Sequence, residues 1–332
     1  MSRTLRPVVA AITAGLAAGF TVPAASAAPA AKPATLAKLD VRGQISARGS
    51  VVALTQVHGN AATLWVGSGG KLPAPVNIAT AVPAWGQPRI GTDAGRRPVV
   101  VYPSCTDRAI VATCDLRVYD IAAGTDAEVP GINLPGVGET EGSMDRGAIA
   151  FTRWSSPLDP SALAEGGYGS AATTLAYRPF GEPVQVLTTS GGQQLNLNRG
   201  RIVQVRDTDP GFGICGRPAV EIVRVDGHAR KTLGAHGCGM SGQTIVAPTF
   251  IDDTVVWGLR SFDGSYLERT SAAGGAPVQQ AKIRGGFAAL APTSRSSAKF
   301  VYGPYLSEPG SADEAAGSGW ELRHAKRLVF GG

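Results

Sequence analysis

Six short runs of β-branched and apolar residues recur at nearly even spacing along this chain of 332 residues. Their first residues are 48, 49, 54, 53 and 45 positions apart. Each run follows a turn that contains Gly, Asp or Asn. The runs are 51–54, 99–102, 148–151, 202–205, 255–258 and 300–302. This period constrains the fold more than any other feature, because repeats of 20 to about 50 residues are typical of solenoids, arrays and propellers.

A second alternating run and a polar turn follow each of the first runs. The second runs are 64–66, 116–119, 175–177, 222–225, 267–269 and 322–324. Alternation with period two between turns is the signal of hairpin strands. Six copies of about 50 residues, each with room for four strands, predict an all-β chain that forms a six-bladed β-propeller of four-stranded antiparallel blades. A pair of β-sandwiches also has many short strands, but its strands need not repeat as a unit.

The content of glycine and proline supports this interpretation. The chain has 44 Gly and 23 Pro, which disfavour helices and supply turns. About four turns in each of six repeats account for this excess. How the ring closes stays open, because residues 39–41 either complete the blade that holds 320–330 or lie outside it.

The N-terminus has the pattern of a cleaved export signal. Arg3 and Arg6 precede an apolar run over 8–22, and Pro23 and the small residues 25–27 follow it. Fifteen apolar residues are fewer than the roughly 20 that cross a bilayer as a helix. We therefore expect a signal peptide that is cleaved after Ala27.

Three parts of the chain follow from this interpretation. Residues 1–27 are the signal peptide, 28–40 are an Ala/Pro/Lys-rich flexible leader, and 41–332 are the propeller. The mature protein is predicted to be secreted, to the extracellular space or the cell envelope, with no transmembrane segment. Without the signal peptide it has 29 basic and 25 acidic residues, a charge of +4. Because this charge is small and scattered, nucleic acid is not an expected partner. A monomer is expected.

The four cysteines indicate a disulfide framework in an oxidising compartment. Cys105, Cys114, Cys215 and Cys238 allow three connectivities. We favour the two pairs that are local in sequence, Cys105 with Cys114 and Cys215 with Cys238. The alternative, a zinc site that includes His236, lacks the paired C-x-x-C spacing of such sites. No metal or other cofactor is expected.

Some of the repeats resemble a known family. Residues 145–151 (DRGAIAF) are similar to the turn and first strand of the TolB-like repeat, in the WD40-like group of periplasmic and secreted propellers. Residues 116–120 (LRVYD) and 222–227 (IVRVDG) are similar to its second half. The resemblance covers most of 41–330 and implies a six-bladed propeller that acts as a binding or scaffold protein without catalysis.

Long connections are predicted on one face of this propeller. With strands A to D numbered outward, the B–C loops and the D–A crossovers emerge on the same face, because chain direction alternates. Four B–C connections are long: 103–113, 155–172, 207–217 and 303–319. Loops of this length in a compact domain are usually functional or disordered. Both proposed disulfides lie on this long-loop face, which we predict engages another exported protein or a cell-envelope component.

Polar residues precede or begin the predicted A strands, around the mouth of the central channel. They are Trp85, Gln87, Glu139, Glu141, Gln194, Asn196 and Gln243. Amides, carboxylates and an aromatic face suit a small polar ligand. The alternative is that they are the polar lining of any wet channel.

Signatures of catalysis are few. The sequence contains no Gly-x-Ser-x-Gly elbow, phosphate-binding Walker loop or His-Glu-x-x-His motif. Glu139 and Glu141 would share a face of a regular strand, about 6–7 Å apart, as an acid–base pair could. The sequence therefore favours a secreted, non-catalytic binding or scaffold protein. The alternative is a secreted hydrolase or lyase that uses carboxylates at the channel mouth.

Overall fold

The structure is a computed structural model. It describes residues 34–39, 45–68, 71, 73–80, 82–107, 113–154, 173–208, 217–236, 244–261, 264–283, 286–294, 297–303, 320–324 and 328–329. Apart from short turns, the regular elements in these ranges are β-strands, all in the unit Lys32–Gly332. The predicted signal peptide lies outside the described residues.

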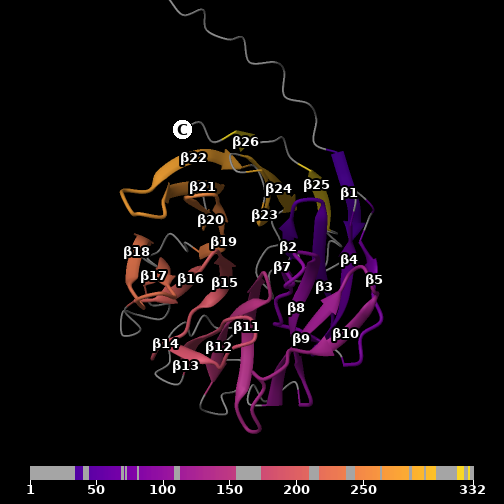
Figure 1. The fold of residues 1–332 in the computed structure, drawn as a ribbon. Helices are drawn as coiled ribbons and strands as arrows, with labels where there is room; N and C mark the ends of the chain where they lie inside the picture. The colour runs from indigo at the N-terminus through magenta and orange to yellow at the C-terminus, as the bar shows by residue number, and fades with distance from the viewer. Residues whose placement is uncertain are drawn as a thin grey trace, which may run out of the picture. The chain divides into compact units, whose positions relative to one another are not determined.

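Five antiparallel sheets each form from strands that follow one another in the chain (Figure 1). The first contains β2 (Ile45–Arg48), β3 (Val51–His58), β4 (Ala61–Gly67), β5 (Ala74–Pro75) and the short β6 (Val82–Pro83), which pairs with β4. The second contains β7 (Arg89–Thr92), β8 (Pro98–Cys105), β9 (Cys114–Asp120) and β10 (Thr125–Glu128). The third contains β11 (Gly138–Asp145), β12 (Ala148–Trp154), β13 (Thr173–Arg178) and β14 (Gln185–Thr188). The fourth contains β15 (Gln193–Asn198), β16 (Arg201–Asp207), β17 (Pro218–Arg224) and β18 (Arg230–Ala235). The fifth contains β19 (Thr244–Ile251), β20 (Thr254–Ser261), β21 (Gly264–Ser271) and β22 (Val278–Ile283).

A sixth sheet has a different plan, which we call the closing sheet. It combines β1 (Ala34–Leu39) with β23 (Gly286–Ser294), β24 (Ser297–Gly303), β25 (Trp320–His324) and β26 (Leu328–Val329). In Figure 1, β1 at the indigo end of the chain lies beside β25 at the yellow end, and the two pair antiparallel. The prediction of six like blades is therefore wrong in number. Five blades of consecutive strands are present, and the sixth sheet joins the two ends of the described chain.

β1 also revises the N-terminal assignment. It occupies 34–39, six residues that the sequence assigns to the flexible leader 28–40. This Ala/Pro/Lys-rich segment has only a weak strand signal by itself. Pairing with β25, almost 300 residues later, supplies the hydrogen-bond partners.

The first strand of each of the five blades lies at its inner edge, and in the closing sheet β23 has this position. β7 contacts both β2 and β11, β15 contacts β11 and β19, and β23 contacts β19 and β2. We call these six strands, β2, β7, β11, β15, β19 and β23, the inner strands. They bring together residues about 53 positions apart in the sequence, and the site described below depends on this arrangement.

The predicted runs are the second and third strands of the sheets. The first runs fall in β3, β8, β12, β16, β20 and β24, and the second runs in β4, β9, β13, β17, β21 and β25. They form strands because branched apolar side chains fit a pleated surface that is covered on both faces. In β8, for example, 99–102 (VVVY) is completely buried. The prediction of four-stranded antiparallel sheets of propeller type is confirmed.

The core lies between neighbouring blades. One cluster joins Val203, Val205, Val220 and Ile222 of the fourth blade to Ile245, Phe250, Val255 and Trp257 of the fifth. Similar clusters join the first blade to the second, the second to the third and the third to the fourth. Each buried Val, Ile or Phe contributes about 1.5–3 kcal/mol relative to leaving it exposed. This packing holds the inner strands in fixed register.

Candidate ligand site at the inner strands

Three inner strands bulge at equivalent positions. Glu141 in β11, Gln194 in β15 and Ala247 in β19 have φ angles of 53°, 54° and 50°, in the left-handed region. The antiparallel register shifts at each of these positions. A bulge leaves one residue out of the strand ladder and redirects its side chain. Here the redirected polar side chains of Glu141 and Gln194 turn toward the next blade.

A relay of hydrogen bonds runs from bulge to bulge. The backbone N–H of Gln194 donates to Oε2 of Glu141 at 2.8 Å. The side-chain carbonyl of Gln194 in turn accepts from the backbone N–H of Ala247 at 2.5 Å, and its amide donates to the Ile245 carbonyl at 3.2 Å. Asn196 donates to the Thr249 hydroxyl at 3.3 Å. Three of the predicted ligand residues therefore join neighbouring blades.

Arg89, at the start of β7, was missed by the sequence reasoning. Its guanidinium donates to the Gln87 side-chain carbonyl at 2.5 Å and lies 3.9 Å from the Glu141 carboxylate. Burial lowers the pKa of Arg89, and the charge of Glu141 partly opposes this effect. Burial also raises the pKa of Glu141. The available signal was its position: Arg89 is a charged residue at the start of a strand, two positions after Gln87.

Glu139 has different partners from Glu141. Its carboxylate, which is completely buried, accepts from Arg153 at 3.0 Å and from the Leu134 N–H at 3.4 Å. Arg153 also donates to the Ile132 carbonyl at 2.8 Å and lies over the Phe151 ring. Burial raises the pKa of Glu139 to about 7, although Arg153 and the Leu134 N–H act to lower it.

The stability of the protein should therefore depend on pH through Glu139. An unfolded glutamate has a pKa of about 4.3, so between about pH 5 and pH 7 the folded state binds a proton that the unfolded state has released. The free energy of unfolding should fall as pH rises through this window and then level off. Between pH 5 and pH 8, the free energy of unfolding of the wild type should fall by about 1–2 kcal/mol more than that of Glu139→Gln. Urea titrations of both proteins at several pH values measure the difference, and a constant difference would contradict the prediction.

The remaining predicted residues are not all brought together. Trp85 and Gln87 are half-buried and precede β7. The Trp85 indole N–H is buried without a hydrogen-bond acceptor among the described residues. Gln243 lies outside the described residues. The structure thus joins Gln87, Arg89, Glu141 and Gln194 in one chain of contacts, while Glu139 belongs to a separate pair.

The cysteine prediction is confirmed for one pair. Cys105 at the end of β8 and Cys114 at the start of β9 form a disulfide with a Cα–Cα distance of 3.9 Å. Cys215 and Cys238 lie outside the described residues. His236 lies 2.9 Å from Glu268, and in the described part of the chain no three His, Cys, Asp or Glu residues group as metal ligands.

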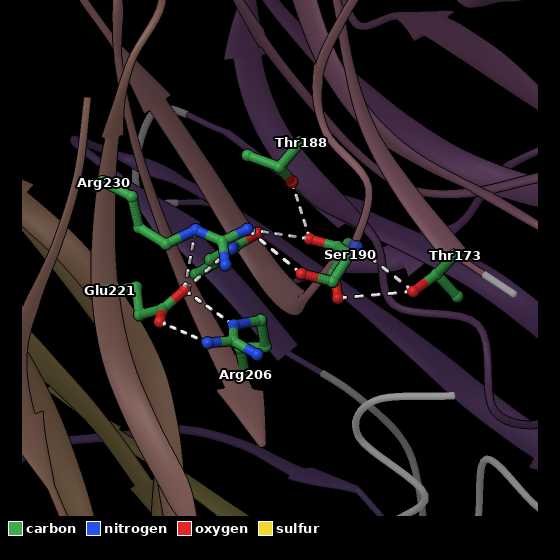
Figure 2. Close-up of polar contacts among 8 residues, drawn as sticks. Thr173, Thr188, Ser190, Arg206, Glu221 and Arg230 are labelled. Carbon is green, nitrogen blue, oxygen red and sulfur yellow. Dashed lines mark hydrogen bonds and ion pairs between the residues drawn. The ribbon is translucent and has the colours of Figure 1, made fainter. Parts of the chain in front are cut away.

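A second polar cluster lies between the third and fourth blades (Figure 2). Arg206 donates to both oxygens of the buried Glu221 at 2.9 Å, and Arg230 lies 3.6 Å from the same carboxylate. Arg230 also donates to the Ser190 hydroxyl at 3.1 Å, in the connection that enters the fourth blade. The Glu221 carboxylate thus orients two guanidinium groups. One of them, that of Arg230, attaches this connection to β18. No motif or spacing in the sequence indicated this contact.

Blades of four antiparallel strands, with their inner strands in mutual contact, define a β-propeller. Solved structures of propellers resemble this chain. Regucalcin, a calcium-binding protein from Agrobacterium tumefaciens, has a TM-score of 0.52 at 12% identity, covering 90% of this chain and 96% of that chain. TolB from Acinetobacter baumannii has a TM-score of 0.50 at 12% identity, covering 84% and 65%. Oligogalacturonate lyase in complex with manganese has a TM-score of 0.50 at 9% identity, covering 84% and 75%.

These likenesses show the fold alone. No family model and no curated protein sequence matches this chain. In the described residues, no helix has the length and apolar character needed to cross a membrane. Function must therefore be argued from the geometry of this chain.

Proposed function

We propose that this chain is an exported, monomeric, non-catalytic binding protein. Its partner would be another exported protein or a cell-envelope component, bound through the long-loop face. The predicted signal peptide over 1–27 and the Cys105–Cys114 disulfide support export. The small net charge makes nucleic acid a poor partner.

The observation that carries this proposal is that the Glu139 carboxylate is occupied by hydrogen bonds within the protein. A catalytic carboxylate must be able to meet a substrate, whereas both oxygens of Glu139 accept internal hydrogen bonds. These bonds hold the crossover between β10 and β11. Two other contacts also hold it: its Pro130 carbonyl accepts from Arg178 of β13, and its Asn133 side chain binds the backbone of Leu116 in β9. Leu134, in the same crossover, is 46% exposed.

Leu134 is thus an apolar side chain on a loop that is ordered before any partner arrives. A preformed loop loses little conformational entropy on binding, which favours affinity. By the alternation of strand direction, this crossover emerges on the predicted long-loop face. The connection 155–172, predicted for the same face, lies outside the described residues. The exposed Phe180, in the turn between β13 and β14, emerges on the opposite face and provides a matched control.

Capture from an envelope extract tests the proposal. The mature chain is immobilised beside three variants: Leu134→Ser, Phe180→Ser, and replacement of 155–172 by a short Gly/Ser linker. We expect Leu134→Ser and the linker variant each to reduce recovery of the same partner at least about five-fold, the loss of one modest interface contact. Phe180→Ser should retain wild-type recovery. Equal recovery by all four proteins would contradict binding through the long-loop face.

A hydrolase or lyase is the second candidate. A carboxyl with a pKa of about 7 suits general acid–base catalysis, and this property of Glu139 favours the candidate. The similarity to oligogalacturonate lyase makes oligogalacturonates the first substrates to assay. Turnover that is lost in Glu139→Gln and retained in Leu134→Ser would replace the binding proposal by the enzymatic one.

A further inference from the structure

Arg89 is a buried cation without a close ionic partner of its own. The residue is 7% exposed, and the described carboxylate paired with it is Glu141, at 3.9 Å. A direct, charge-assisted N–H···O bond is about 2.7–2.9 Å long, so this pair is loose. Taking a guanidinium out of water is costly unless an anion compensates its charge.

Glu141 has partners besides Arg89. Its carboxylate accepts the backbone N–H of Gln194 at 2.8 Å and also binds the N–H of Leu195. Backbone N–H groups that point at a carboxylate favour its charged form. Glu141 is therefore shared between Arg89 and the backbone of β15, and it compensates the charge of Arg89 only from a distance of 3.9 Å.

Two N–H donors on the same segment have no acceptor. Nε of Arg89 and Nε1 of Trp85, four residues earlier, are buried without a hydrogen-bond partner in the part of the chain that the structure describes. A buried donor without an acceptor costs about 1–3 kcal/mol. Trp85 and Gln87 are half-buried, so this segment, which leads to Arg89, reaches the surface.

We propose that Arg89 binds the carboxylate of an acidic ligand, with Trp85 and Gln87 as neighbouring contacts. A carboxylate has the planar shape and two acceptor oxygens that match the guanidinium fork. Glu141, at 3.9 Å from Arg89, would repel a doubly charged phosphate more strongly than a singly charged carboxylate. This inference adds a ligand class to the proposed binding protein. It depends on Arg89, at the crossover that enters β7, and not on Leu134, at the crossover that enters β11.

Titration of the full mature chain with sodium acetate tests the assignment. Ionic strength is held constant with sodium chloride, and the indole N–H signal of Trp85, assigned with Trp85→Phe, is followed by NMR. We expect a saturable shift in the wild type and none in Arg89→Met. Arg201→Met removes an arginine that already has a carboxylate, that of Asp253, at 2.6 Å, so this matched control should keep the wild-type shift.

The variant Glu141→Gln provides a second test, because Arg89→Met could lose the shift through a folding defect. This variant removes the competing negative charge beside Arg89, so acetate should bind at least about five-fold more tightly, as expected for the loss of one partly buried charge repulsion. A saturable shift that persists in Arg89→Met, no saturable shift in either the wild type or Glu141→Gln, or tighter binding of phosphate than of acetate would overturn the assignment. Envelope capture through Leu134 would be unaffected by any of these results, so the two proposals fail separately.

Discussion

Glu221→Ala should destabilise the protein by about 3 kcal/mol. The Glu221 side chain is 1% exposed and neutralises Arg206, which it binds through both oxygens, while Arg230 lies nearby (Figure 2). Removal of one partner of a buried ion pair typically costs about 3–5 kcal/mol, because the other charge stays buried. We expect the lower end of this range, since Arg206 is 19% exposed and Arg230 is 30% exposed, so both can turn toward water.

Urea denaturation at neutral pH measures this loss as a shift of the midpoint. The matched control is Asp226→Asn, which removes the partner of Arg224 from an ion pair that is more than 60% exposed on both sides. Surface pairs of this kind contribute little, so the control should unfold at the wild-type midpoint. Equal midpoints for Glu221→Ala and Asp226→Asn would show that the cluster does not hold the blade connection.

The sequence predicted the middle strands of the sheets better than their inner strands. Residues 202–205 (IVQV) alternate without interruption, and they form part of β16 as expected. In β11, β15 and β19, by contrast, a left-handed residue interrupts the alternation at Glu141, Gln194 and Ala247. A bulge changes which face the following side chains occupy, so period two alone cannot locate it.

The candidate site was predictable by residue but not by contact. Glu141 and Gln194 were both expected around the mouth of the central channel, because both precede or begin predicted A strands. Their hydrogen bond depends on a backbone bulge, and the isolation of Glu139 from Glu141 depends on the crossover that Arg153 holds. Arg89 was missed because its role depends on the buried distance to Glu141, which no local pattern encodes.

The closing sheet shows the same limit. Residues 320–324 have a strand signal, whereas 34–39 (ATLAKL) follow an Ala/Pro-rich segment and have a weak one. Their pairing joins sequence positions that are almost 300 residues apart. Because strand pairing over such a distance leaves no periodic signal, the sequence could state the alternatives for closure but could not choose between them.

Gly91→Ala should destabilise the protein by about 2–3 kcal/mol, the upper part of the usual range for overpacking. Gly91 lies in β7 against β11, where an added Cβ would overlap the Met144 carbonyl oxygen and stand 2.9 Å from the Met144 Cβ. Because part of the obstacle is backbone, relief requires the two inner strands to separate. Separation would loosen the relay from Arg89 through Glu141 to Gln194.

Gly227→Ala is the matched control, since an added Cβ at Gly227 meets nothing within 4 Å and its φ is not left-handed. It should change the free energy of unfolding by no more than about 0.5 kcal/mol. Thermal and urea unfolding of the two variants make the comparison. If Gly91→Ala were as stable as Gly227→Ala, β7 and β11 could not lie as close as the structure places them. The distance between Arg89 and Glu141, on which the carboxylate site rests, would then be wrong as well.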